Sequence, residues 1–379
     1  MKKIIAALLC LCLCLAACGK QPEQTEPSTL PSTAATTEAT TEATTEATTE
    51  ATTEATTEPT TVPTEPELNY RHPITGQPLA EPLTVRPVAL VTNNYKDAQP
   101  VLGISHADII FEHITEGLGY ETRMLAVYTH LNFDDRLGTV RSARTYSVSI
   151  ANSFDALFVH CGGSTMALKK ITNTKCPSLD QFYNGDYFYR DQSRKAAGYG
   201  SEHSLVTEGN LLLKGLDTKS WDKTIPEDTY YGFDFSDEAD WNGAAADTVT
   251  IQYYNTNGKY TVMTYDKNDG MYYGTQSWSK KQAAVCDGNT GDSVPFKNVL
   301  VLKTKLTFDG DGSHVYMDLV GKGDGFLARD GQYVPIQWSR ASEDDHFTFT
   351  LEDGTPVTFG VGKTFVSVLP TRSPEVIFE

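Results

Sequence analysis

Six consecutive Ala-Thr-Thr-Glu repeats occupy residues 35–58 and set the first limit on how this chain can fold. They lie within residues 18–67, a stretch dominated by Thr, Glu, Ala and Pro that has very few large apolar side chains. A segment of this composition cannot bury enough apolar surface to offset the conformational entropy lost on folding. We therefore expect residues 18–67 to form a disordered stalk, and the folded body to lie in residues 68–379.

Residues 1–17 have the parts of a bacterial export signal. Two lysines precede an apolar run over residues 4–15, and small residues then lead to Cys18. The apolar run is shorter than the roughly 18 residues that a membrane-spanning helix needs. The segment resembles a lipobox, in which the cysteine is acylated, with palmitate among the usual chains, and becomes the mature N-terminus. This resemblance implies a lipid anchor on the extracytoplasmic face of a bacterial cell membrane.

The charge of the chain limits its partners. Its formal net charge is -18, and the folded body keeps an excess of acids after the glutamates of the stalk are set aside. Such a surface repels nucleic acid and anionic lipid, so we expect neither as a partner of the body. Any anion that the protein binds must be held by a local cluster of positive charge.

The cysteines indicate neither a disulfide framework nor a metal site. Of seven cysteines, three leave with the signal and Cys18 is acylated, which leaves Cys161, Cys176 and Cys286. An odd number leaves at least one thiol unpaired, and we favour buried thiols over a Cys161–Cys176 disulfide. Their spacing fits no zinc site. Asp309-Gly-Asp-Gly begins like a calcium loop but lacks its later ligands, so a hairpin turn is expected. We expect no metal and no cofactor.

The body is predicted to be an α+β protein with two domains. In residues 68–225 apolar runs alternate with helical patterns, which is typical of an α/β layered domain. In residues 226–379 alternating strands and Asp-Gly or Asn-Gly turns predict a mostly antiparallel, β-rich domain. The expected strands of the first domain include residues 86–92, 108–114, 123–129, 137–140 and 156–160, and its expected helices are residues 142–154, 165–172 and 208–216.

Arg141 and Arg144 are the first candidate ligand-binding residues. They fall where the expected strand of residues 137–140 meets the expected helix of residues 142–154. The free N–H groups and the dipole of a helix N-terminus favour an anion, and arginine adds forked donors that suit phosphate or carboxylate. The alternative is that both arginines form ion pairs with local acids such as Asp134, Asp135 or Asp155.

A second strand-to-helix turn carries further candidates. His160 ends an apolar strand, and Gly162, Gly163 and Ser164 open the next expected helix. In an open α/β sheet, ligands bind at the carboxyl ends of the strands, so we expect both turns to face one crevice. Glycines would let a ligand approach the backbone. The alternative for His160 is a structural role in the core.

Other candidates depend on residues further along the chain. Arg190 and Arg194 belong to a short basic run that either joins the same pocket or faces water, and His203 follows it. Asp108 and His203 are weak candidates for catalysis. Asp108, Glu112 and His113 share one expected strand, whose alternation would place neighbours on opposite faces of the sheet.

The motifs after the stalk resemble the YerB-like family of bacterial lipoproteins, in both its N-terminal and its C-terminal domain. The resemblance rests on Arg86-Pro-Val-Ala-Leu-Val, Gly138-Thr-Val-Arg-Ser-Ala-Arg144, His160-Cys-Gly-Gly-Ser164, Lys297-Asn-Val-Leu-Val and Gly362-Lys-Thr364. It implies architecture and an envelope location but no reaction. The chain departs from the family pattern at Cys161, where a small residue is usual, and at Glu202-His203-Ser204, which replaces Pro-His-Asn.

Three functional hypotheses follow. The first is a membrane-anchored protein that binds a phosphate- or carboxylate-bearing envelope ligand through an arginine-lined pocket. The second is a phosphotransferase or hydrolase of a polyprenyl pyrophosphate lipid with Asp108 as metal ligand or base, because the motifs are also similar to LytR-CpsA-Psr phosphotransferases. The third is a scaffold that docks a protein through an aromatic patch of Tyr272, Tyr273 and Trp278.

Overall fold

The computed structural model describes residues 67–379 apart from residues 116–120, 255–257, 311 and 373–374. The export signal, Cys18 and the stalk lie outside the described residues. In the described part the protein is strand-rich, with several sheets and four α-helices. The Asp330-Gly331 turn forms a hairpin as predicted, and the strands before and after the segment that begins at Asp309 pair antiparallel. None of these helices is long and apolar enough to cross a membrane.

One sheet of eleven strands runs through the protein. Its order is β12 (Ala244–Ala245), β22 (Gln332–Arg340), β21 (Gly321–Arg329), β18 (Asn298–Thr304), β25 (Thr364–Pro370), β4 (Ile109–Ile114), β5 (Thr122–Tyr128), β3 (Val88–Asn93), β7 (Leu157–His160) and β8 (Ser178–Asp180), with β23 (Thr348–Thr350) beside β22. Strand β25 comes from the C-terminal half and pairs in parallel with β4 from the N-terminal half. The two expected domains therefore share a sheet, and their boundary at residue 225 stays a prediction.

The smaller sheets and the helices surround this sheet. A second sheet has the order β16 (Lys281–Ala284), β15 (Met271–Trp278), β14 (Lys259–Asp266), β13 (Thr248–Gln252) and β26 (Val376–Phe378), with β17 (Pro295–Phe296) beside β15. A third contains β6 (Arg136–Gly138), β10 (Leu205–Glu208) and β9 (Tyr189–Arg190). Three two-stranded sheets pair β1 (Tyr70–Arg71) with β2 (Pro78–Leu79), β11 (Asp234–Ser236) with β24 (Thr358–Gly360), and β19 (Leu306–Phe308) with β20 (Val315–Met317). The helices are α1 (Thr145–Ser153), α2 (Thr165–Thr174), α3 (Gln192–Ala196) and α4 (Gly209–Asp217).

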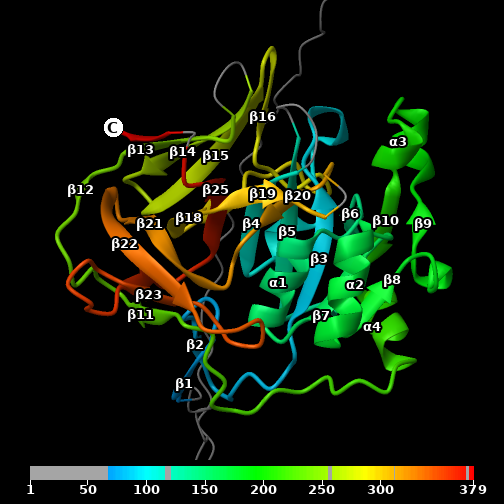
Figure 1. The fold of residues 1–379 in the computed structure, drawn as a ribbon, viewed down its shortest axis with the longest axis horizontal. Helices are drawn as coiled ribbons and strands as arrows, with labels where there is room; N and C mark the ends of the chain where they lie inside the picture. Colours follow the sequence, from blue (N-terminus) through cyan, green and yellow to red (C-terminus); the bar gives the residue numbers. More distant parts are fainter. Residues whose placement is uncertain (1–66, 116–120, 255–257, 311, 373–374) are drawn as a thin grey trace, which may run out of the picture. The chain divides into compact units, whose positions relative to one another are not determined.

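The helices lie on the side of β3, β7 and β8, whereas β13–β15 and β21–β23 lie on the other side of β4 in this view (Figure 1). Short 3-10 turns complete the chain, at Lys96–Ala98, Ile104–His106, Gly185–Tyr187 and Ser201–His203.

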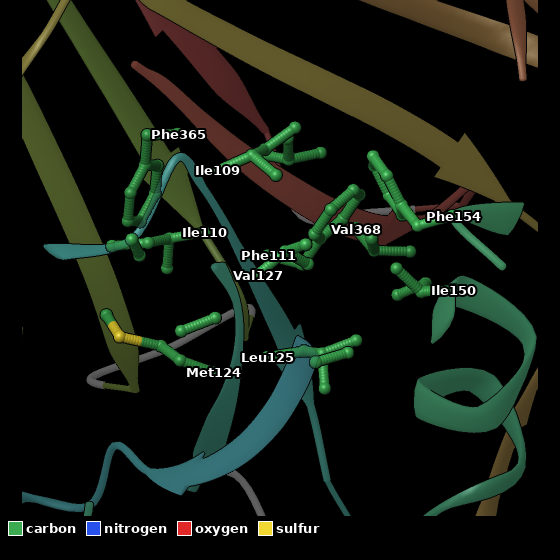
Figure 2. Close-up of a cluster of buried hydrophobic side chains, with 14 of the residues drawn as sticks. Ile109, Ile110, Phe111, Met124, Leu125, Val127, Ile150, Phe154, Phe365 and Val368 are labelled. Carbon is green, nitrogen blue, oxygen red and sulfur yellow. The ribbon is translucent and has the colours of Figure 1, made fainter. Parts of the chain in front are cut away.

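The core forms on both faces of β4 because successive side chains of a strand point in opposite directions. On one face, Phe111 meets Phe154, the residue directly after α1, with ring centroids 5.8 Å apart. On the other face, Ile110 lies beside Phe365 of β25 in the strand register. Figure 2 shows the two groups, with Ile150 and Phe154 on the helix side and Met124 on the opposite side. All of these side chains are buried, so both faces of the central strands are inside the protein.

Helix α1 begins three residues later than predicted. The expected helix started at residue 142, but Arg141 and Ala143 use their backbone groups to bond β3, the residue after β7 and the following glycine turn. A backbone that is committed to such cross-strand bonds cannot also adopt helical torsions, so the helix starts at Thr145.

The predicted aromatic patch of the C-terminal half does not form. Tyr272 and Trp278 are on β15, where both side chains are almost fully buried. The Tyr272 hydroxyl donates to the carbonyl of Ala246, and the Trp278 ring packs beside the ammonium of Lys259. The scaffold hypothesis fails on this patch because the second sheet packs these rings inward.

Candidate functional site

Several strands bring polar side chains to one edge of the large sheet. Strands β3 and β7 are parallel neighbours, so both end at this edge, with Asn93 and His160 as their last residues. Strand β4 ends here too, and β5, which is antiparallel to both β3 and β4, starts here. The register places His113, Arg123 and Asn93 in one row across three adjacent strands. The predicted position of the site at the strand ends therefore has a geometric basis in the sheet.

Arg141 is fixed at this edge by its backbone. Its N–H donates to the carbonyl of Val91 on β3 at 3.0 Å, and its carbonyl accepts from the N–H of Cys161 at 3.0 Å. Its side chain is partly exposed and donates from Nη1 to the carbonyl of Glu202 at 3.1 Å. Burial, followed by the nearby positive charge of Arg123, lowers the pKa of the Arg141 guanidinium.

The local acids that could have neutralised Arg141 are bonded elsewhere. Asp134 accepts from the side chain of Asn210, Asp135 pairs with His106, and Asp155 pairs with Arg86. Within the part of the chain that the structure describes, Arg141 forms no ion pair with any carboxylate, and its Nε has no hydrogen-bond partner. The local ion pairs that were the alternative for this arginine are therefore not made.

Arg144 is the residue that immediately precedes helix α1. Its backbone N–H donates to the hydroxyl of Ser147, which closes the first turn of the helix. Its side chain is buried and donates from Nη1 to the carbonyl of Ala143 at 2.8 Å. Arg144 thus lies inside the protein at the start of α1, next to the row of His113 and Arg123, and both arginines lower the pKa of His113.

Arg123 adds a cation that the sequence analysis did not single out. It is on β5, is almost fully buried, and donates from Nη1 to the carbonyl of Ser142 at 2.8 Å. On the neighbouring strand, the His113 ring lies edge-on to Tyr146, with ring centroids 4.5 Å apart. Burial first, and Arg123 next, lower the pKa of His113 to about 3. This histidine is therefore neutral at physiological pH, and neither ring nitrogen has a hydrogen-bond partner among the described residues.

Arg190 approaches the same edge from β9. It donates from Nη1 to the carbonyl of Ser201 at 2.6 Å, one residue before the carbonyl that accepts from Arg141. Both arginines lie close enough to Cys161 to lower the pKa of its thiol, but burial and Asp180 outweigh them and raise it. Cys161 therefore stays a protonated thiol. We call Arg123, Arg141, Arg144 and Arg190 the arginine cluster.

The glycine turn after β7 is tied into the protein. Gly162 has a φ of +60°, and a Cβ at this position would lie 2.6 Å from the Phe182 ring. Its N–H donates to the carboxylate of Asp180, and the N–H of Ser164 donates to the carbonyl of Ala143. The Gly163 backbone bridges to Ala143 in parallel register. Two of these three amides are thus engaged by the protein, so the turn positions α2 more than it offers donors.

His160 and Ser164 have local partners as well. The Nδ1 of His160 bonds the carbonyl of Gly162 at 2.7 Å and its Nε2 bonds the hydroxyl of Ser178 at 2.6 Å. Ser164 caps α2, since its hydroxyl accepts from the N–H of Ala167. Burial lowers the pKa of His160 in spite of Asp180 nearby. This environment is that of a core histidine with both ring nitrogens engaged.

Arg194 does not join the arginine cluster. Its buried guanidinium donates to the carbonyls of Ala98, Pro100 and His203, and it stacks over the Tyr199 ring. His203 is closer to the cluster, with Nδ1 2.9 Å from the Asn93 amide nitrogen and Nε2 3.6 Å from the Glu202 carboxylate. Burial lowers the pKa of His203 although Glu202 opposes this.

Asp108 lies away from the cluster. It immediately precedes β4, whereas His113 is near the far end of that strand, and five strand residues span roughly 16 Å. One carboxylate oxygen of Asp108 accepts from both the N–H and the hydroxyl of Thr129. The residue proposed as base or metal ligand is therefore at the opposite end of the strand from the arginines.

Sequence reasoning missed Arg123 and His113 as members of the site. Arg123 is a charged residue at the start of an apolar strand, which is a weak sign of a functional site. The residues beside it depend on how β3, β4 and β5 pair. That register is a long-range property, and it decides which face of the sheet receives each side chain.

Comparisons with known proteins agree with the sequence resemblance. Residues 74–222 match the N-terminal domain, and residues 249–366 the C-terminal domain, of the family described as "Protein of unknown function (DUF3048)". The chain is 29% identical over 302 residues to the "Putative lipoprotein YerB" of Bacillus subtilis, which covers 79% of this chain and 86% of that protein. The crystal structure of YerB from Bacillus subtilis superposes with a TM-score of 0.66 at 26% identity, covering 79% of this chain and 96% of that one.

Proposed function

Because this chain belongs to the DUF3048 family, whose two domains match most of its folded part, we propose that it is a lipoprotein and that it binds an anion. In this proposal Cys18 anchors the protein on the extracytoplasmic face of the cell membrane. The arginine cluster then holds a phosphate- or carboxylate-bearing ligand of the cell envelope.

The observation that carries the proposal is the state of Arg141. It lies at the ends of β3 and β7, is held there by its backbone, and has no carboxylate partner in the described part of the chain. A partly buried guanidinium that has lost hydration without gaining a counter-ion is costly unless a ligand supplies the charge. Its Nε, which has no protein partner among the described residues, is a donor that a bound anion could use.

The surroundings of Arg141 favour an anion of compact charge. Arg123 and Arg144 lie at the same end of the strands, and α1 begins there, so that the dipole of its N-terminus adds to the attraction for an anion. Arginine forks bind phosphate and carboxylate in a bidentate manner. In a protein with a formal net charge of -18, these side chains form a local positive field that can select such a ligand.

A phosphotransferase or hydrolase is less well supported than a binding protein. That hypothesis assigned the base or metal ligand to Asp108, which lies at the opposite end of β4 and is bonded to Thr129. We therefore propose binding without turnover.

The test uses the full-length protein in detergent and inorganic pyrophosphate as the probe. We expect isothermal titration calorimetry to detect binding to the wild type, and Arg141→Ala to weaken it at least tenfold. Raising the salt concentration should weaken binding as well, because charge pairing carries the affinity.

Arg71→Ala is the matched control. Arg71 also donates from Nη1 to one backbone carbonyl, that of Gly76, at 3.1 Å, but lies on β1 away from the strand ends. This variant should bind pyrophosphate like the wild type. Equal binding by Arg141→Ala and the wild type, or no binding by the wild type to pyrophosphate or citrate at millimolar concentration, would refute the proposal.

A further inference from the structure

A hollow that contains none of the cluster arginines lies at the β8 edge of the large sheet. It has a volume of about 560 Å³ and opens between α2, the outer edge of β8 and the segment after α4. This size is within the range of about 300–1,000 Å³ that is typical of small-molecule sites. The side chains that line it include Leu168, Lys175, Asp180, Tyr183, Asn184 and Trp221.

Aromatic rings are unusually accessible at this hollow. The side chain of Tyr183 is 88% exposed, although it stands in an ordered turn directly after β8. Trp221 also lines the hollow and is half-buried. Large apolar rings that gather at an open concavity of a soluble protein usually mark a binding surface.

Polar groups with unused bonding capacity lie between these rings. One carboxylate oxygen of Asp180 accepts from the backbone of Gly162 and Phe182, and its other oxygen has no partner among the described residues. The ammonium of Lys175 likewise forms no bond or ion pair in the described part of the chain. Asn184 is held in place beside them, because its amide oxygen accepts from the ammonium of Lys219 at 2.6 Å and its amide nitrogen donates to the carbonyl of Asp180 at 2.8 Å. The hollow thus offers donors and acceptors of both charge signs.

We propose that this hollow binds the sugar rings of a saccharide. A pyranose ring has an apolar C–H face that stacks on Tyr183 or Trp221, and a rim of hydroxyl groups that both donate and accept hydrogen bonds. An acyl chain would leave Asp180 and Lys175 buried without partners, and a lone anion would use neither aromatic ring. The site stands independently of the arginine cluster, because none of its contacts involves Arg141.

The distribution of tryptophans supplies a direct probe. The protein has four tryptophans, and Trp241, Trp278 and Trp338 are at most 8% exposed. Trp221 is therefore the tryptophan that an aqueous quencher reaches most readily. We expect chitotetraose, a neutral tetramer of N-acetylglucosamine, or maltotetraose at millimolar concentration to reduce acrylamide quenching of the full-length protein at least twofold, and Trp221→Phe to abolish this change.

Variants at the hollow separate this proposal from the previous one. Tyr183→Ala should weaken saccharide binding at least tenfold, whereas Tyr230→Ala, which removes an exposed tyrosine that does not line the hollow, should have no effect. Arg141→Ala should bind the saccharide like the wild type even where it loses pyrophosphate. The proposal is overturned if neither tetramer protects Trp221, or if protection is equal in the wild type and Tyr183→Ala.

Discussion

Glu112 and His113 are consecutive residues of β4, yet they lie in opposite electrostatic environments. Glu112 faces the second sheet, where the ammonium of Lys259 is 2.6 Å away and the side chains of Asn94, Thr122 and Thr261 donate to its carboxylate. His113 faces α1, where Arg123 and Arg144 are near and no described residue bonds its ring nitrogens.

The difference indicates that the buried charges of β4 and its neighbours have two roles: those on one face hold the fold together, and those on the other are available to a ligand. A buried ion pair with all its hydrogen bonds made is complete, and it specifies how β4 meets the second sheet. The helix face instead accumulates positive charge, and Arg141, which is partly exposed, has no carboxylate partner in the described part of the chain. The comparison predicts that changes on the Glu112 face cost stability, whereas changes at Arg141 cost binding.

The largest effect is expected from Lys259→Met. Both Lys259 and Glu112 are fully buried, so this change leaves an uncompensated carboxylate inside the protein. Loss of one partner of a buried pair costs about 3–5 kcal/mol. Urea unfolding should show this loss of unfolding free energy. The double variant Glu112→Gln, Lys259→Met, which also removes the carboxylate, should recover more than half of it. A loss below about 1 kcal/mol would mean that the pair does not hold the two sheets together.

Acid should destabilise the His113 face. Burial lowers the pKa of His113 from 6.5 to about 3, so the folded protein keeps it neutral while the unfolded chain takes up a proton. Stability that is complete above pH 6.5 is therefore lost as the pH falls towards 3, at about 1.4 kcal/mol per pH unit for this group. Between pH 6.5 and 4.5 this amounts to about 2–3 kcal/mol.

Urea unfolding at several pH values tests the sign and the size of this slope. His113→Phe keeps an aromatic ring against Tyr146 but removes the proton site, so its stability should fall less steeply with acid. His160 contributes in the same direction, because burial lowers its pKa as well. A slope that is unchanged in His113→Phe would show that His113 takes up a proton in the folded protein.

Arg194→Ala should cost about 2 kcal/mol of unfolding free energy. Its guanidinium bonds three backbone carbonyls and stacks over Tyr199, so truncation leaves buried acceptors without a donor. Lysine cannot reproduce the fork, so Arg194→Lys should restore less than half of the loss. Thermal unfolding measures both variants, and full stability of Arg194→Ala would return this residue to the list of ligand candidates.

The smallest effect on stability is expected from Arg141→Ala. The side chain makes one hydrogen bond to a carbonyl and no ion pair in the described part of the chain, so the unfolding free energy should change by less than about 1 kcal/mol. Urea unfolding of this variant beside Arg194→Ala compares two of the candidate arginines directly. A loss above about 2 kcal/mol for Arg141→Ala would place it with the structural cations.

Local patterns predicted much of the fold. The strand predicted at residues 123–129 is β5 at residues 122–128, the helix predicted at residues 165–172 is α2 at residues 165–174, and the Asp330-Gly331 hairpin is present. Alternation, capping and left-handed turn residues act over only a few positions. The position of Arg141 and Gly162 at strand ends was predictable for the same reason. The start of α1 was not, since its delay depends on bonds from Arg141 and Ala143 to distant strands.

The contacts that each charged side chain makes could not be predicted from its neighbours in the sequence. Arg190 and Arg194 are four residues apart, yet one reaches the cluster and the other bonds carbonyls near residue 100. Arg123 lies in the site because its strand, β5, pairs with β3 on one side and β4 on the other. The contact of Arg194 with Ala98 joins residues that are 96 positions apart, and that of Arg123 with Asn93 joins two strands that are not consecutive in the chain, so no short window of sequence contains both partners.

The sequence alone determined the composition of the stalk, the cysteine signal, the strand-rich body and the excess of negative charge, because each is a property of neighbouring residues or of their sum. Only the tertiary structure decided which charges are neutralised. Pairing β4 with both β25 and β5 sends Glu112 to Lys259 and His113 to the arginines. Since a shift of one residue in a strand exchanges its two faces, this division exists only once the strands have paired.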